Sequence, residues 1–89
     1  MKVTVNVYAF LRSRTGWGSR EVELKSSYAK LVDVLEVIPE LKEIVIVDGD
    51  IDRAIIILVN GRNIRQTGGL DTMLTEGDRI DVFPPAAGG

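Results

Sequence analysis

The sequence predicts an α+β domain in which a mixed sheet of about five strands carries one long helix on one face. Three observations lead to this fold class. Apolar and polar residues alternate near both ends of the chain, an amphipathic helical pattern lies between these segments, and a continuous apolar run follows the helix. The 89 residues suit one domain, since domains are commonly on the order of 100 residues.

The N-terminal segment is expected to form a hairpin. Apolar residues of one parity indicate a half-buried strand over residues 3–11. These residues are Val3, Val5, Val7, Ala9 and Leu11. Residues 13–19 carry two glycines around a tryptophan and predict a turn, and residues 21–25 alternate again as the second strand.

One amphipathic helix is expected after the hairpin. Apolar residues follow helical spacing from Tyr28 to Ile38, about three turns, and Ser26 and Ser27 are suitable N-cap residues. Pro39 is expected to end the helix, because its ring clashes with the preceding turn. Proline also suits the first position of a helix, so a short second helical piece can begin there.

The C-terminal half supplies the remaining strands. Residues 54–59 form a continuous apolar run, which is typical of a central strand covered on both faces. Asn60-Gly61 is a strong hairpin signal, so residues 63–66 are expected to form a short return strand. Residues 70–74 suggest one helical turn, and residues 79–83 alternate as the last strand. The expected domain is therefore 1–83, followed by a flexible Pro-Pro-Ala-Ala-Gly-Gly tail over 84–89.

Composition excludes most kinds of active site. Without cysteine or histidine, the chain offers no thiolate nucleophile, no imidazole base and almost no zinc chemistry. The net charge of −2 and the pI near 5.0 argue against nucleic acid as a partner. No apolar run approaches the roughly 20 residues of a membrane span, and no signal sequence is visible, so a cytoplasmic protein is expected. We predict no catalytic residue, no metal ligand and no bound cofactor.

The chemistry is expected at the tail. Gly88 and Gly89 end the sequence, and a terminal carboxylate can be activated by a separate enzyme that consumes ATP. Glycine has no Cβ, so its backbone can pass through a narrow channel where a side chain would collide. Pro84 and Pro85 stiffen the exit from the last strand and reduce the entropy lost when the tail docks. The alternative is that the two glycines are incidental.

A partner surface is expected on the sheet face away from the helix. If Val7 and Val82 face the core, parity turns Tyr8 and Phe83 to the opposite face. Neighbouring first and last strands would then bring the two aromatic rings together beside the tail, and Ile64 on the short return strand could extend the patch. Grouped exposed aromatic residues are typical of an interaction surface. The alternative is that they only cover the open sheet.

Four segments together resemble the MoaD/ThiS group of ubiquitin-like sulfur carriers, and most closely its molybdopterin synthase small-subunit branch. They are residues 11–16, 59–61, 76–80 and 83–89, the last reading Phe-Pro-Pro-Ala-Ala-Gly-Gly. The resemblance implies the β-grasp, or ubiquitin-like, fold. It also implies that a ubiquitin-activating-type adenylyltransferase uses ATP to adenylate Gly89, which becomes a thiocarboxylate. In that branch the sulfur passes to a pyranopterin precursor on a large synthase subunit, forming the dithiolene that binds molybdenum or tungsten.

Three other functions remain open at this point. The same tail could join the protein to lysines of other proteins, as a ubiquitin-like modifier. It could carry sulfur for a thiamin-type pathway. A binding-only module is the third, and in that case the two glycines would have no chemical role.

Overall fold

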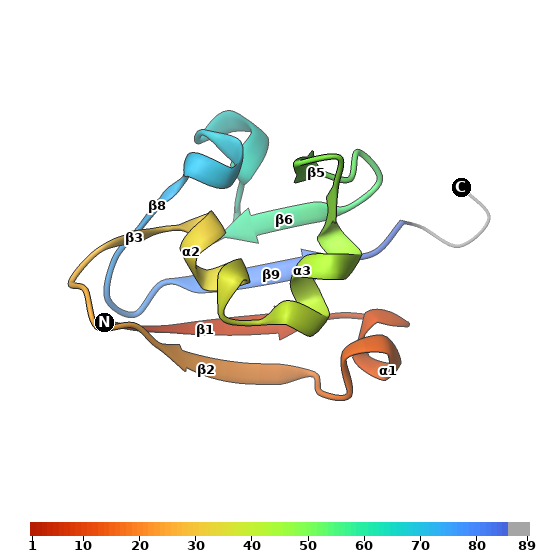
Figure 1. The fold of residues 1–89 in the computed structure, drawn as a ribbon, viewed down its shortest axis with the longest axis horizontal. Helices are drawn as coiled ribbons and strands as arrows, with labels where there is room; N and C mark the ends of the chain where they lie inside the picture. The colour runs from red at the N-terminus through yellow and green to blue at the C-terminus, as the bar shows by residue number, and fades with distance from the viewer. Residues whose placement is uncertain (86–89) are drawn as a thin grey trace.

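The computed structural model describes residues 1–85 and contains a mixed five-stranded sheet with two helices on one face (Figure 1). Across the sheet the strands are β2 (Ser19–Glu23), β1 (Lys2–Val7), β9 (Arg79–Phe83), β6 (Ile56–Val59) and β7 (Arg62–Asn63). The predicted α+β fold class is confirmed. The first and last strands of the chain are neighbours, and they lie at the centre of the sheet.

Strands β1 and β9 are parallel and end at the same edge of the sheet. Val5 lies opposite Ile80 and Val7 opposite Val82. One residue further on, the Tyr8 amide donates to the Val82 carbonyl at 3.2 Å. All other strand pairs in this sheet that the structure describes are antiparallel. The chain therefore leaves β9 beside the point where it leaves β1.

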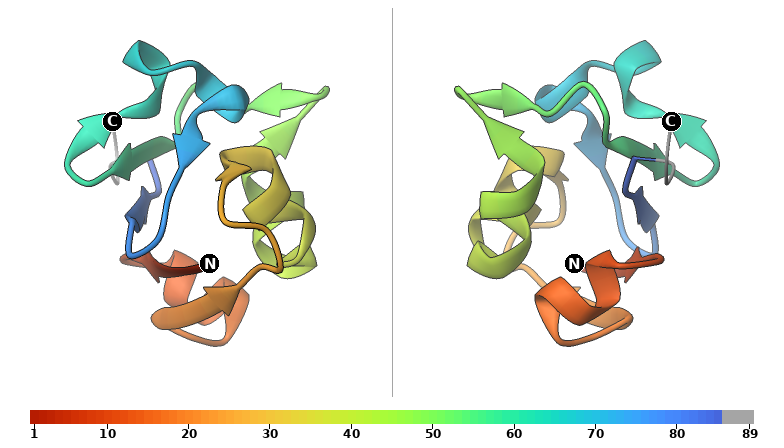
Figure 2. Two further views of the ribbon diagram at one scale, coloured as in Figure 1. Left: turned by 90° about the vertical axis from the view of Figure 1, so that its left-hand side faces the viewer. Right: turned by 90° about the vertical axis from the view of Figure 1, so that its right-hand side faces the viewer.

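The predicted helix from Tyr28 to Ile38 is shorter than expected, and the second helical piece expected from Pro39 is present. The two helices are α2 (Leu31–Glu36) and α3 (Pro39–Val45), and both lie against the same face of the sheet (Figure 2). Pro39 begins α3 at its first position, as expected for a residue that lacks an amide proton. The Ile38 carbonyl accepts from the amides of both Leu41 and Lys42.

The N-terminal part of the expected helix is a strand. β3 (Ala29–Lys30) pairs with β8 (Met73–Leu74), and the Leu31 amide then donates to the Thr72 carbonyl at 2.9 Å. The helix begins after this pairing, and the Asp33 carboxylate accepts from the Lys30 amide at 2.8 Å. Local propensity favoured a serine cap, but a pairing with a segment more than 40 residues away along the chain decided the boundary.

The core lies between the sheet and the two helices. Its largest members come from β1, α2, α3, β6 and β9, together with Leu11, Ile38, Ile64 and Leu74. Residues 54–59 were expected to be covered on both faces, and this is wrong. Ile57 and Val59 are buried, whereas Ile56 is exposed, so β6 has one open face.

The first strand is shorter than predicted. Residues 2–7 are extended, but Ala9 is exposed and has a left-handed backbone with φ of 54°. The chain then enters α1 (Leu11–Thr15), which replaces the beginning of the expected turn and buries Leu11. Ala9 therefore does not face the core.

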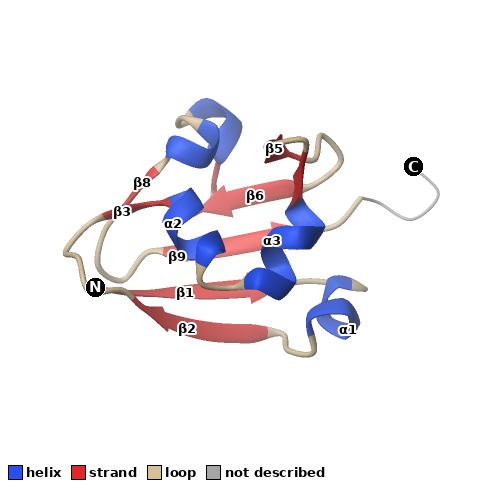
Figure 3. Cartoon of the chain, viewed as in Figure 1, coloured by secondary structure: helices blue, strands red, loops and turns tan. Residues whose placement is uncertain are grey.

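The remaining elements are short (Figure 3). They are β4 (Ile46–Val47), β5 (Asp50–Ile51) and the 3-10 turns η1 (Ile64–Gln66) and η2 (Gly69–Asp71). The Asn60-Gly61 hairpin is confirmed: φ is 50° and 85° at these residues, and β6 pairs with β7 across them. The return strand is limited to β7, and the expected turn over 70–74 divides between η2 and β8.

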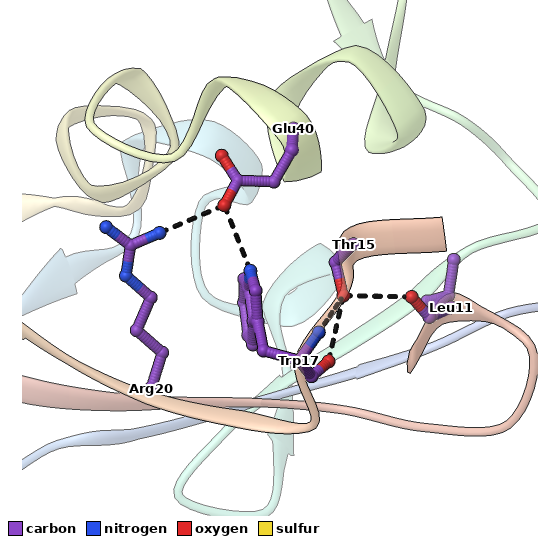
Figure 4. A network of polar contacts seen from close by, with 5 residues as sticks. All are labelled: Leu11, Thr15, Trp17, Arg20 and Glu40. Carbon is purple, nitrogen blue, oxygen red and sulfur yellow. Dashed lines mark hydrogen bonds and ion pairs between the residues drawn. The ribbon is translucent and has the colours of Figure 1, made fainter. Parts of the chain in front are cut away.

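One polar cluster ties the connection between β1 and β2 to helix α3 (Figure 4). The indole of Trp17 donates to a Glu40 carboxylate oxygen at 2.9 Å, and Arg20 donates to the same oxygen at 3.0 Å. Arg20 also lies over the Trp17 ring, 5.9 Å from its centroid. The Thr15 hydroxyl bonds the Leu11 and Trp17 carbonyls. This cluster fixes the segment that follows the exit of β1.

Acid is expected to weaken this cluster through Glu40. The Trp17 hydrogen bond, with help from Arg20, holds the pKa of Glu40 below its ordinary value of 4.5. A lowered folded-state pKa means that the contribution to stability is complete above the unfolded-state pKa and is lost as pH falls through the folded-state value. The stability difference between wild type and Glu40→Gln should therefore begin to shrink as pH falls below the ordinary pKa of 4.5, and be lost as pH falls through the lowered pKa of folded Glu40, as measured by denaturation followed through Trp17 fluorescence. A difference that stays constant from pH 7 to pH 3 contradicts this prediction.

Candidate functional site

The structure brings Tyr8 and Phe83 together where β1 and β9 end. Their ring centroids are 4.4 Å apart and the ring planes differ by 8°, so the two rings are stacked. Tyr8 is 38% exposed and Phe83 is half-buried. The sequence predicted that these two aromatic residues meet on the open face, and their adjacency is confirmed. Their role as a partner surface remains a prediction.

A polar network lies beside the aromatic pair. One carboxylate oxygen of Asp81 accepts from the Tyr8 hydroxyl at 2.9 Å and from the Asn6 amide group at 3.0 Å. The other oxygen accepts from Arg79 Nε at 2.9 Å. Asp81 is only 5% exposed, so these bonds satisfy a charge that little solvent reaches. No pattern in the sequence predicted this network, although strand parity places Asp81 on the same face as Phe83.

The network shifts the pKa of both titratable partners. The hydrogen bond to Asp81 raises the pKa of Tyr8; burial and the carboxylate charge add to this, and Arg79 opposes it. Burial raises the pKa of Asp81, but hydrogen bonds from Asn6, Tyr8 and Arg79 outweigh burial, so the pKa lies below its ordinary value. At neutral pH the phenol is therefore a stable donor and the carboxylate a stable acceptor.

The apolar part of the surface differs from the prediction in one residue. Ile64 was expected to extend it, but Ile64 is 1% exposed and belongs to the core. After β7 the Asn63 side chain accepts from the Arg65 amide, and the chain enters η1 with Ile64 turned inward. Ile56 takes this place, because it lies opposite Phe83 in the β6–β9 pairing and is 46% exposed. The alternation that reveals Ile56 was hidden within the continuous apolar run.

The tail begins directly at this surface. Phe83 is the last residue of β9, and Pro84 and Pro85 follow it, both half-buried. Gly88 and Gly89, with the two alanines before them, lie outside the described residues. The predicted boundary between the domain and the tail, after residue 83, coincides with the end of β9. The predicted flexibility of the tail stays a prediction.

Other kinds of site receive no support from residues 1–85. In this part of the chain, no three His, Cys, Asp or Glu side chains are placed to hold a metal ion. Nor does any helix there have the length and hydrophobicity to cross a membrane. The candidate site therefore lies at the ends of β1 and β9. It consists of the stacked rings, the Asp81 network and the start of the tail.

Several relatives share sequence with this chain. The CysO sulfur carrier protein of Mycobacterium bovis is 32% identical over 94 residues, covering 100% of both chains. An Archaeoglobus fulgidus protein provisionally named a sulfur carrier is 42% identical over 50 residues, 56% of this chain and 57% of its own. Small archaeal modifier protein 3 of Haloferax volcanii is 43% identical over 42 residues, 47% of this chain and 46% of its own. For the latter two, the chain spans about half the length of the relative.

Solved structures agree with the fold. Small archaeal modifier protein 1 of Methanosarcina acetivorans has a TM-score of 0.77 at 32% identity, covering 99% of this chain and 96% of its own. A Pyrococcus furiosus protein, provisionally named molybdopterin converting factor subunit 1, has a TM-score of 0.74 at 31% identity, with 97% and 99% covered. A chain of the Amycolatopsis orientalis BexX/CysO complex has a TM-score of 0.78 at 28% identity, with 98% and 99% covered. The fold is the ubiquitin-like β-grasp.

A model of one protein family also matches this sequence, from residue 5 to residue 89. This span includes the second half of β1, the helical layer, β9 and the tail. The carriers and modifiers named above are small proteins of the same fold. Taken together, the matched span, the full-length CysO relative and the β-grasp architecture show that this chain belongs to the ThiS family, among the ubiquitin-like sulfur carriers.

Proposed function

We propose that this protein carries sulfur as a thiocarboxylate on Gly89. The observation that carries the proposal is the rigid exit of the tail: the central strand β9 ends in the stacked Phe83, and Pro84-Pro85 follows at once. A tail that begins from a fixed point loses less entropy when it enters the active site of a partner. The family match that runs through residue 89 supports a reaction at that position.

The chemistry proceeds in two steps on a partner enzyme. A carboxylate oxygen of Gly89 attacks the α-phosphorus of ATP, and the bond to pyrophosphate breaks to leave an acyl-adenylate. Hydrosulfide then attacks the acyl carbon, AMP leaves with the bonding electron pair, and a thiocarboxylate and one proton remain. The chain supplies the acyl group and a docking surface, and a ubiquitin-activating-type adenylyltransferase supplies ATP and catalysis. Tyr8 and Phe83, extended by Ile56, are the proposed docking surface.

The proposed acceptor of the sulfur is a pyranopterin precursor. A large molybdopterin synthase subunit would hold the precursor while two sulfur transfers build the dithiolene for molybdenum or tungsten. The Phe-Pro-Pro-Ala-Ala-Gly-Gly ending and the likeness to the Pyrococcus furiosus protein support this branch. The proposed location is the cytoplasm, where the activating enzyme finds ATP, and no nucleic acid or membrane takes part.

Sulfur loading is tested by intact mass. Incubation of the purified protein with ATP, the adenylyltransferase of its host and sodium hydrosulfide should add about 16 Da, because one oxygen is replaced by sulfur. The initial mass also shows whether Gly89 bears a free carboxylate, which the proposal requires. Omission of ATP is the control and should leave the mass unchanged. An unchanged mass despite measured pyrophosphate release would reject the carrier function.

A protein-modifier function is the second candidate, and likeness to small archaeal modifier proteins favours it. The same acyl-adenylate would react with a lysine amine and form an isopeptide bond, releasing AMP. Cells expressing the protein should then contain target peptides with a branched remnant from the tail after proteolysis. If cells grown under varied conditions lack such peptides, the modifier function is excluded, and sulfur loading is unaffected by that result.

A further inference from the structure

Asp81 occupies an unusual position in the sheet. It lies on the central strand β9, on the face away from the helices, between Asn6 of β1 and Leu58 of β6. It is nonetheless buried, and it accepts hydrogen bonds from Asn6, Tyr8 and Arg79. A carboxylate held by three donors defines their directions more strictly than an apolar side chain could.

Burial alone does not explain a carboxylate at this position. Removing a charge from water is costly, and an apolar residue of similar size often gives equal or higher stability. The Tyr8 hydroxyl has one described acceptor, which is Asp81 at 2.9 Å. The ring that carries this hydroxyl is the one stacked on Phe83 at 4.4 Å. The contacts therefore run from Asp81 through Tyr8 to Phe83.

Phe83 is the last residue before the tail. Its ring stacks on the ring of Tyr8, the residue after β1, and Phe83 lies opposite Ile56 of β6. The carbonyl carbon of Phe83 is bonded to the nitrogen of Pro84. Proline fixes its own φ and restricts the residue before it. A fixed Phe83 ring thus determines the direction in which Pro84 and Pro85 leave the sheet.

We propose that Asp81 is a positioning residue for the tail. By holding the Tyr8 hydroxyl, Asp81 fixes the Tyr8–Phe83 stack and so orients the point from which the tail enters the activating enzyme. The proposal rests on the proposed function. Asp81 does not touch the reacting carboxylate, so its effect is on docking. The three donors Tyr8, Asn6 and Arg79 determine how firmly the Asp81 carboxylate is held.

The first test measures the contact between Asp81 and Tyr8 in the isolated protein. In a Tyr28→Phe background the chain has one phenol, since it contains two tyrosines. Asp81→Asn removes the charge and weakens the acceptor, so the phenol pKa, measured by absorbance at alkaline pH, should fall toward its ordinary value of 10.0. The ring-proton chemical shifts of Phe83 should change in the same variant. An unchanged phenol pKa and unchanged shifts would overturn the proposal.

The second test separates docking from chemistry. The assay contains the host adenylyltransferase, ATP and sodium hydrosulfide. Asp81→Asn should raise the KM for this protein about 5- to 10-fold and change kcat less than about twofold, because docking is weakened while the reacting group is retained. Tyr8→Phe keeps the ring and removes the hydroxyl, so it should raise KM similarly. The double variant should be no worse than either single one, as expected for residues that act in series.

Glu40→Gln is the matched control. Like Asp81, Glu40 accepts hydrogen bonds from one aromatic side chain and one arginine. Glu40 lies on α3, however, in the separate cluster around Trp17. It should leave KM within twofold of wild type. If Asp81→Asn raises KM and Tyr8→Phe does not, Asp81 acts by another route and the proposal is wrong. If wild type is activated and neither variant changes KM, the positioning role of Asp81 is wrong but the proposed function stands. If wild type itself is never activated, the proposed function is wrong, and the docking role of Asp81 is then wrong as well.

Discussion

Deletion of Gly88 and Gly89 is expected to abolish ATP-dependent sulfur loading, with a rate loss of at least about 1,000-fold. The deletion removes the reacting carbon and leaves a tail two residues shorter, ending at Ala87. A carboxylate held about 7 Å short of its reaction position cannot reach the α-phosphorus of ATP. The new terminal residue also carries a methyl group where the glycine backbone was to pass.

The melting temperature of the truncated protein is the control for this deletion. The core and the strands that the structure describes lie within residues 1–85, which the deletion leaves intact, so the melting temperature should stay within about 2 °C of wild type. Gly89→Ala keeps the length and the carboxylate but adds one methyl group, and an intermediate rate is expected. Loading of the truncated protein at the wild-type rate would contradict a reaction at Gly89. Binding without loading by the truncated protein would agree with the proposal, because the docking surface is retained.

Substitution of Leu35 by alanine is expected to cost about 3 kcal/mol of unfolding free energy. Leu35 lies in α2 with its side chain 1% exposed, within the core between the sheet and the helices. The loss combines the transfer free energy of the missing methyl and methine groups with the cost of the cavity. For a domain of this size the melting temperature should fall by about 12–24 °C.

Val37→Ala is the matched control for the core substitution. Val37 lies two residues further along, at the end of α2, and is 47% exposed. Its loss should cost less than about 0.5 kcal/mol. Denaturant unfolding of both variants, followed by Trp17 fluorescence, gives the comparison. Equal costs for the two substitutions would show that α2 does not pack as the structure describes.

Much of this fold was accessible from local patterns. Alternation over residues 3–11 and 79–83 predicted two strands with one buried face each. Both strands are present, although the first ends at Val7 and Asp81 on the open face of β9 is also buried. The same parity predicted that Tyr8 and Phe83 share the open face, and their rings are stacked. Period-two alternation holds whichever strand is the neighbour, so it could be used before the topology was known.

The errors arose where a distant segment competed with local preference. Ser26 and Tyr28 fit the start of a helix, but β8 pairs with β3 and delays it to Leu31. Ile64 fits a strand, but the turn into η1 places its side chain in the core. In both cases burial and pairing with residues remote in the sequence outweighed propensities that are worth a few tenths of a kcal/mol per residue.

By itself, the sequence determined which side-chain chemistry is available: it has no thiol and no imidazole. It therefore predicted a reaction at the tail, where the glycines and prolines fit the proposed activation by a partner. Only the tertiary structure decided what stands at the base of that tail. Asp81, Tyr8 and Asn6 lie up to 75 positions apart along the chain, and no local pattern encodes a contact over that separation. The parallel pairing of β1 with β9 creates the contact, because it places the ends of both strands at one edge of the sheet.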